Sequence, residues 1–237
     1  MADFWLLIAW ASATLSVAGL SVVIGRRFGI EYIVATMAGM LIVANILATK
    51  LVTVWHYNVP AGVLPFAATF LLTDLLVEKW GRAKAQKAVW TGFYASVVVL
   101  VPITIAVHWE SAFPSDLFDS FDAVLGLTWR VVLASLAAYL VSQHHDIVAF
   151  TIWRKITGGR FLWFRNNAST MVSQFIDSSI FITIAFAGRD GFPPLMSLIV
   201  GQYIIKLIIA AVDTPLMYII SYCVDKLPDR SQSQNSR

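Results

Sequence analysis

RNNASTMVSQFIDSSIFITIAF, residues 165–186, has the length of a membrane span and carries a carboxylate, Asp177, near its middle. An ionised aspartate at the centre of a spanning helix costs about 2.5–3.5 kcal/mol on insertion scales, so it must face a partner or a wet cavity. Gln174 lies one helical turn before Asp177 and Phe181 one turn after it, on the same face. The stretch therefore predicts a spanning helix with an amide, a carboxylate and an aromatic ring on its inner face.

The pattern SQxxDxxxF occurs twice, at residues 142–150 and at residues 173–181. A duplicated element in successive membrane helices favours a site built between them, as in transport proteins with internal repeats. A chance match is the alternative for a pattern this short. The polar residues that the two copies contribute to the predicted site are Gln143, Asp146, Gln174 and Asp177.

Composition places the chain in a membrane. Mean hydropathy is +0.73, and 58% of residues are apolar against 13% charged, whereas about a quarter of residues are charged in soluble domains. The net charge of +3 is too small to indicate binding of nucleic acid. Cys223 is the only cysteine, which excludes an intrachain disulfide and a cysteine-based metal cage.

The expected fold is an all-α polytopic membrane protein, a bundle of six to seven transmembrane helices. Apolar segments fall at 4–25, 30–56, 59–79, 88–109, 123–153, 166–187 and 195–223. Pro60 interrupts the second and third, so residues 30–79 form either two spans or a broken helix. We expect an extra N-terminal helix over 1–25, the main bundle over 26–224, and a disordered cytoplasmic tail over 225–237.

Loop charge tests the number of spans. With seven spans, the acidic residues between the fourth and fifth lie on one side and the basic connections on the other. By the positive-inside rule, the N-terminus is outside and the C-terminus cytoplasmic. The basic residues of these connections are Arg26, Arg27, Lys79, Arg82, Lys84, Lys87, Arg154, Lys155, Arg160, Arg165 and Lys226.

Further polar side chains fall at membrane depth. Asp74 is expected to be functional, whereas Glu78 has the alternative of a solvated or paired interface residue. Asn45 and Lys50 lie in the second segment, where Lys50 has the alternative of reaching the outer interface. Gln202, Lys206 and Asp213 share one face of the last span, and Lys206 is the natural counter-ion for Asp177 or Asp213. A purely structural ion pair is the alternative.

Enzyme signatures such as HExxH, GxSxG and a phosphate-binding glycine loop are absent from the sequence. The adjacent histidines His144 and His145 point to different helix faces, so neither a metal site nor a cofactor is expected. Amides and carboxylates beside aromatic rings suit a flat heterocycle, such as a purine analogue, whose edge they read. A vitamin or another cyclic amide is equally allowed by the residue types.

Several motifs resemble those of the queuosine precursor transporter family, also described as vitamin uptake transporters. The resemblance covers roughly residues 30–223 and rests on motifs of modest individual specificity. They are Asn45-Ile-Leu-Ala-Thr-Lys50, Gly62-x-x-x-Phe66, Thr73-Asp74-x-x-x-Glu78-x-x-Gly81, Ser142-Gln143-x-x-Asp146, Trp163-x-Arg165-Asn166-Asn167-x-Ser169-x-x-x-Ser173-Gln174-x-x-Asp177, Lys206 and Thr214-Pro215-Leu216.

The resemblance implies uptake of 7-cyano- and 7-aminomethyl-7-deazaguanine, precursors of the tRNA base queuosine, across a bacterial inner membrane. It also implies a purine-like small molecule and the bilayer as partners. Leu64-Pro65 before Phe66 departs from the family's Phe-Pro, which puts that aromatic contact in doubt. The expected substrate-binding residues are Asn45, Lys50, Asp74, Glu78, Gln143, Asp146, Gln174, Asp177, Phe181 and Lys206.

Three alternatives stay open at this point. One is a substrate-capture subunit for a vitamin-type solute that works with a separate ATP-driven module. Another is a membrane enzyme acting on a lipid, and the third is a purely structural subunit. Small residues such as Ala134, Ser135 and Ala138 allow close helix packing within one chain or in a homodimer.

Overall fold

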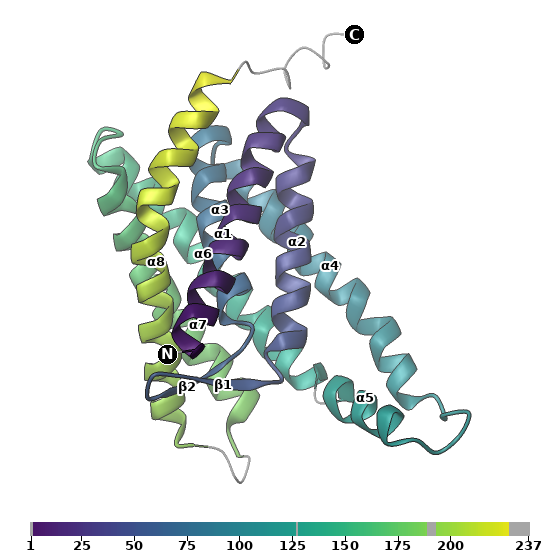
Figure 1. Ribbon diagram of the computed structural model, residues 1–237. Coiled ribbons are helices and arrows are strands. Elements are labelled where there is room, and N and C mark those ends of the chain that lie inside the picture. The colour runs from purple at the N-terminus through teal and green to yellow at the C-terminus, as the bar shows by residue number, and fades with distance from the viewer. Residues whose placement is uncertain (1, 127, 189–192, 228–237) are drawn as a thin grey trace.

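Long helices that run up and down across the molecule dominate the computed structural model, which describes residues 2–126, 128–188 and 193–227 (Figure 1). Five stretches of these residues are long and apolar enough to cross a membrane: 8–28, 82–108, 116–156, 162–186 and 195–226. The elements are α1 (Ala2–Phe28), α2 (Glu31–Leu47), β1 (Leu51–Val54), β2 (Tyr57–Pro60), α3 (Val63–Trp80), α4 (Arg82–His108), α5 (Asp116–Gly126), α6 (Thr128–Ile156), α7 (Leu162–Phe186) and α8 (Leu195–Lys226).

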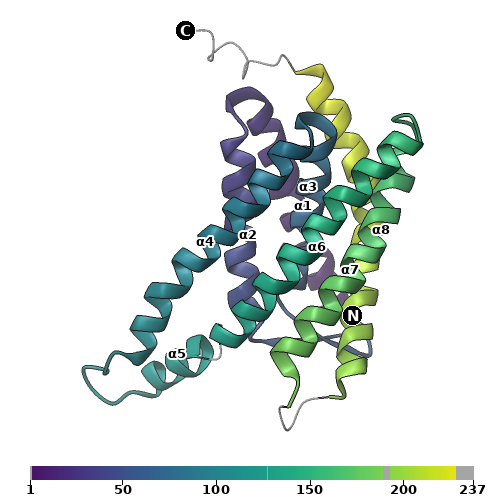
Figure 2. The same cartoon turned by 180° about the vertical axis from the view of Figure 1, so that it is seen from behind.

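Helix α3 is the centre of the bundle. It contacts α1, α2, α4, α6 and α8, and every residue from Val63 to Val77 is buried. Asp74, Glu78 and Lys79 make α3 too charged for a helix that faces lipid. Because α3 is wrapped by other helices (Figures 1 and 2), Asp74 is buried in protein, while Glu78 and Lys79 near the end of the helix form ion pairs with neighbouring helices. A surrounded helix therefore carries much of the polar interior.

The outer surface of the bundle is apolar, as a bilayer requires. Large exposed side chains include Trp90, Tyr94 and Val98 on α4, Val141 on α6 and Val212 on α8. Helix α4 diverges from the bundle toward its C-terminal end and carries α5 beside it (Figure 2). The charged residues that are buried lie inside the bundle, so the molecule has an apolar exterior around a polar centre.

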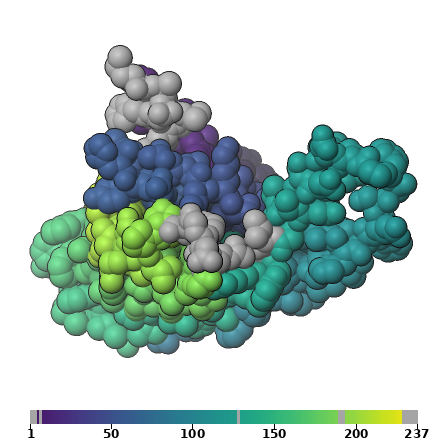
Figure 3. All heavy atoms as spheres, turned by 90° about the horizontal axis from the view of Figure 1, so that it is seen from below, coloured from purple at the N-terminus to yellow at the C-terminus, as the bar shows by residue number. Residues whose placement is uncertain are grey.

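Residues 51–60 form a β-hairpin, so the expected apolar segments 30–56 and 59–79 were wrong at their boundaries. Leu51 pairs with Pro60 and Val54 with Tyr57. Proline lacks an amide donor, and β-branched residues favour strands, which explains why the helical pattern stops here. The hairpin lies across one end of the bundle (Figure 3). Its Val59 is buried in a cluster with Val63 of α3 and Ile205 of α8.

Basic connections gather at one end of the molecule, as the sequence predicted. The turns after α1, α3 and α6 and the end of α8 lie together, opposite the hairpin and α5 (Figure 1). Helices α1 to α4 and α6 to α8 run between the two ends (Figure 1). The assignment of the basic end to the cytoplasm stays a prediction. Helix α8 continues to Lys226, and residues 228–237 of the predicted tail lie outside the described residues.

The closest approach of α2 and α3 depends on a glycine. A β-carbon at Gly62 would overlap the carbonyl oxygen of Ala44 and would lie 2.9 Å from its carbonyl carbon. The contact is to backbone, which cannot rotate away, so Gly62→Ala must separate the two helices. We expect a loss of about 1–3 kcal/mol in the free energy of unfolding, the usual cost of overpacking, measured by thermal unfolding in detergent.

Gly39→Ala is the matched control, because a β-carbon on this exposed residue of α2 meets nothing within 4 Å. We expect it to be neutral or to stabilise the helix by about 0.5–1 kcal/mol. Equal melting temperatures for the two variants would contradict the close approach.

Candidate functional site

An ion pair between Lys206 and Asp177 lies in the interior of the bundle. Lys206 Nζ donates to Asp177 Oδ2, and Ser142 Oγ donates to Asp177 Oδ1 at 3.3 Å. Each charged residue is only 1% exposed. Lys206 Nζ also lies 4.7 Å from the centre of the Phe66 ring, a cation–π contact. Helices α3, α6, α7 and α8 therefore meet at one buried pair of charges.

A narrow cavity lies on the hairpin side of this ion pair. The cavity is lined by the ion pair itself, by the aromatic rings of Phe66 and Phe181, and by the amides of Asn45 and Gln202. Within the described residues, Asn45 Oδ1 and Gln202 Oε1 are buried without a hydrogen-bond donor. This hairpin-side cavity thus combines flat apolar surfaces with polar groups that are free to bind a ligand.

A second, small cavity lies on the basic side of the ion pair and is also lined by Lys206. Its polar lining consists mainly of acceptors. In the part of the chain that the structure describes, four of its buried oxygens have no donor: Asp74 Oδ1, Asn166 Oδ1, Gln174 Oε1 and Asp213 Oδ1. Lys206 is the residue that reaches both cavities from between them.

The two SQxxDxxxF elements contact each other through reciprocal hydrogen bonds. Ser142 of the first donates to Asp177 of the second at 3.3 Å, and Ser173 of the second donates to Asp146 of the first at 3.0 Å. Helices α6 and α7 are consecutive, run in opposite directions and pack side by side (Figure 2). The exchange is the pattern that a two-fold relation between inverted repeats produces.

The two glutamines of these elements have different surroundings. Gln143 is tied to α3, because Thr73 Oγ1 donates to its Oε1 at 2.8 Å and its Nε2 donates to Thr69 Oγ1 at 3.0 Å. Gln174 instead lines the basic-side cavity. The first glutamine positions helices, and the second is available to a ligand.

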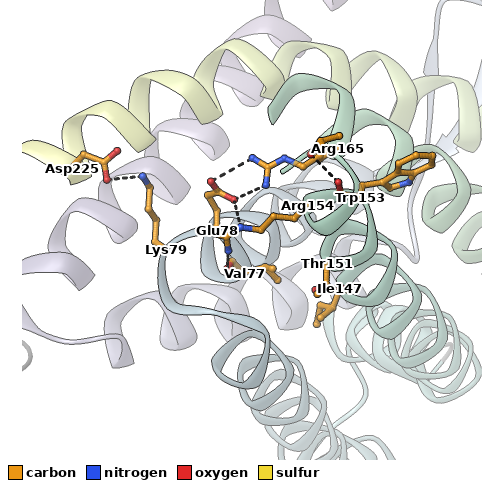
Figure 4. Close-up of polar contacts among 10 residues, drawn as sticks. Val77, Glu78, Lys79, Ile147, Thr151, Trp153, Arg154, Arg165 and Asp225 are labelled. Carbon is orange, nitrogen blue, oxygen red and sulfur yellow. Dashed lines mark hydrogen bonds and ion pairs between the residues drawn. The ribbon is translucent and has the colours of Figure 1, made fainter. Parts of the chain in front are cut away.

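The basic end of the bundle is held by a second group of charges. Arg165 of α7 makes a two-pronged contact with Glu78 of α3, at 3.0 and 3.4 Å, and Arg154 of α6 lies 3.6 Å from the same carboxylate (Figure 4). The Phe150 ring packs 5.2 Å from the Arg165 guanidinium. Lys79 at the end of α3 binds Asp225 of α8 at 2.6 Å (Figure 4). These contacts close the polar interior at the basic end.

The structure brings together most of the residues that the sequence singled out. The hairpin-side cavity receives Asn45, Asp177, Phe181 and Lys206, and the basic-side cavity receives Asp74, Gln174 and Lys206. Asp146, Gln143 and Glu78 lie outside both cavities, with Asp146 bound by Ser173 and Glu78 by Arg165. Lys50 is exposed in the turn after α2 and lines neither cavity.

The lining residues that were not among the expected site residues include Phe66, Asn166, Gln202 and Asp213. Gln202 and Asp213 follow from the spacing on α8, because they share a face with Lys206. Asn166 lies two turns before Gln174 on α7. Among the described residues no group of histidine, cysteine and acidic side chains is arranged to hold a metal ion. His144 and His145 bind different partners, Leu140 and Ser173.

An apolar helical exterior around an interior that holds buried charges and two cavities defines a class of protein, the multi-pass membrane protein with an interior polar site. Residues 60–220 match the family model described as "Putative vitamin uptake transporter". The chain belongs to this family of transporters, as its motifs led us to expect.

Named relatives point in the same direction. A probable queuosine precursor transporter of Bacillus subtilis is 31% identical over 74% of this chain and 77% of its own length. The queuosine precursor transporter of Escherichia coli is 25% identical over 80% of this chain and 85% of its own. A probable queuosine precursor transporter of Haemophilus influenzae is 30% identical over 53% of this chain and 51% of its own. No solved structure matches the chain.

The buried ion pair makes a testable prediction about stability. Lys206→Met leaves the Asp177 carboxylate buried without its cation, and Asp177→Asn leaves the ammonium group without its anion. Removing one partner of a buried pair costs about 3–5 kcal/mol, whereas removing both is often close to neutral. We expect the double variant to unfold at a higher temperature than either single variant.

Thermal unfolding of the unmodified protein, the two single variants and the double variant in one detergent forms a double-mutant cycle that measures the coupling between the two charges. Additive losses would show that the two charges do not depend on each other, contrary to the contact described.

Proposed function

We propose that this protein imports 7-deazaguanine precursors of queuosine, the 7-cyano and 7-aminomethyl compounds, and that it transports them rather than modifying them chemically. The observation that carries the proposal is the lining of the hairpin-side cavity, with Phe66 and Phe181 beside Asn45, Gln202 and the Lys206–Asp177 pair. The names of the Bacillus subtilis and Escherichia coli relatives, both queuosine precursor transporters, support the same substrate class.

The chemistry of a deazaguanine matches this lining. Its ring is flat and apolar on both faces, so it stacks on phenylalanine rings, which contributes about 1–3 kcal/mol per base in other proteins. Its edge presents N–H groups next to a carbonyl oxygen. The free oxygens of Asn45 and Gln202 accept from the N–H groups, and Lys206 donates to the carbonyl. Asp177 keeps Lys206 charged and in place.

The proposed path runs from the hairpin end to the basic end. The Lys206–Asp177 pair separates the two cavities, and the Glu78–Arg165 contact closes the path beyond the second one. Both must open in turn for a solute to pass. We propose that the basic end faces the cytoplasm of a bacterial inner membrane, following the positive-inside rule, so that this direction is import.

A substrate-capture subunit for a vitamin-type solute is the second candidate, and the description of the family favours it. Such a subunit binds its solute but moves it only with an ATP-driven partner. An exchange assay with the purified protein in vesicles distinguishes the two candidate functions, because only a self-sufficient transporter exchanges solute without an added ATP-driven partner.

Uptake of labelled 7-cyano-7-deazaguanine into a bacterial strain that cannot synthesise the precursor tests the proposal. We expect uptake with the intact protein, loss of uptake for Asp177→Ala, and about three- to tenfold weaker half-saturation for Asn45→Leu and for Gln202→Leu, because each removes one hydrogen bond to the ring edge. Competition by guanine, by adenine and by a panel of vitamins defines the class of solute.

Gln86→Leu is the matched amide control, since Gln86 lies on α4 outside both cavities. Membrane levels of each variant are compared first. Unchanged uptake by Asp177→Ala, or competition by a vitamin but not by deazaguanines, would overturn the proposed function.

A further inference from the structure

The buried charges of the bundle do not balance. Lys206 pairs with Asp177, and Arg165 pairs with Glu78. Asp74, Asp146 and Asp213 are 1%, 0% and 5% exposed, and within the described ranges none of these three carboxyl groups has a cationic partner. A buried ionised carboxylate without a partner is costly. Positive charge from outside the chain must therefore reach this part of the interior.

Two of these acids lie against the same turn of α7. Thr170 donates to Asp74 Oδ2 on α3 and Ser173 donates to Asp146 Oδ1 on α6, at 3.4 and 3.0 Å, and Thr170 and Ser173 are three residues apart on α7. The other oxygen of each carboxyl is buried and has no donor among the residues described. Two neighbouring buried carboxyl groups without a cation favour a state in which they share one proton.

The pair opens onto the basic-side cavity. Asp74 lines this cavity together with Asp213, whose Oδ1 is buried without a donor in the part of the molecule described. The free oxygens of Asn166 and Gln174 face the same space. The cavity therefore has acceptors on several sides and is large enough for a water molecule beside Asp74.

The charged groups around the pair are few. On α3 the next is Glu78, on α6 the next is His145, which contacts Ser173, and on α7 they are Arg165 and Asp177. Helix α8 contributes Lys206 and Asp213 to the adjoining cavity. Arg165 is held by Glu78, whereas Lys206 lines the same cavity as Asp74 and Asp213. Lys206 is therefore the cation that these acids can attract away from Asp177 when they lose their proton.

We propose that Asp74 and Asp146 bind a proton that crosses the membrane together with the substrate, so that transport is driven by the proton gradient. The proposal rests on the transport function proposed above. With the proton bound, Lys206 stays on Asp177 and separates the two cavities. When the proton leaves toward the basic end, the ionised pair draws Lys206 into the basic-side cavity, and the partition between the cavities opens. Proton release and solute passage are coupled through one lysine.

Vesicles containing the purified protein test the proposal with 7-cyano-7-deazaguanine, which is neutral and so brings no charge of its own. Counterflow, the exchange of labelled for unlabelled compound without any gradient, first measures transport itself. A tenfold proton gradient is then imposed. We expect accumulation of up to about tenfold for one proton per solute, abolished by a protonophore and not reproduced by a sodium gradient.

Asp74→Asn and Asp146→Asn are expected to lose both counterflow and accumulation driven by the proton gradient, because an amide mimics the protonated acid, leaves Lys206 on Asp177 and keeps the partition between the cavities closed. Asp119→Asn, an exposed residue of α5, is the matched control and should keep both activities. Absence of counterflow with the unmodified protein would reject the proposed function. Counterflow that ignores the proton gradient, or gradient-driven accumulation in Asp74→Asn, would reject proton coupling alone.

Infrared spectroscopy gives a readout that does not depend on transport. The unmodified protein should show the C=O stretching band of a protonated carboxylic acid that is absent from Asp74→Asn and present in Asp119→Asn. Identical spectra for the three proteins at every pH would overturn the proton site.

Discussion

A single buried ion pair, Lys206 with Asp177, organises the interior of this molecule. It lies where four helices meet, and its Lys206 lines both cavities of the bundle. In water such a pair contributes little, but in an apolar bundle each partner is too costly to leave alone. Whatever moves Lys206 must therefore supply another anion. That requirement links the position of one side chain to the state of the acids around it.

The electrostatic asymmetry of the bundle follows from how α3 is placed. A helix that carries Asp74 and Glu78 cannot face lipid, so it is wrapped by its neighbours, and its acids meet residues of α6, α7 and α8. The arginines at the basic end neutralise Glu78 and leave the deeper acids uncompensated. The interior thus has a satisfied, rigid end and an unsatisfied centre, which is the arrangement expected where a solute or an ion is bound.

The sequence predicted the bundle, the basic end and several residues that line the two cavities. Charged side chains at membrane depth are rare, so they can be recognised from the sequence alone. Asp177, Gln174 and Lys206 were found in this way. The hairpin over residues 51–60 was not, since an apolar β-branched run beside a helix reads like its continuation. Lys50 was expected in the site but lies exposed, because the helix ends at Leu47. Phe66 is apolar, so nothing in the sequence distinguishes it from other membrane-helix residues, and its place in the hairpin-side cavity depends on tertiary packing.

The exchanged serine–aspartate bonds of α6 and α7 have a consequence for how the protein is made. Asp146 and Asp177 each receive a hydrogen bond from the other helix, so neither helix satisfies its own acid when it is alone in lipid. Only five residues, 157–161, separate the two helices along the chain. The favourable course is for them to leave the insertion machinery as a preformed hairpin, with their carboxylates already turned toward each other. Membrane insertion and function then both require that the carboxylates of α6 and α7 face the partner helix.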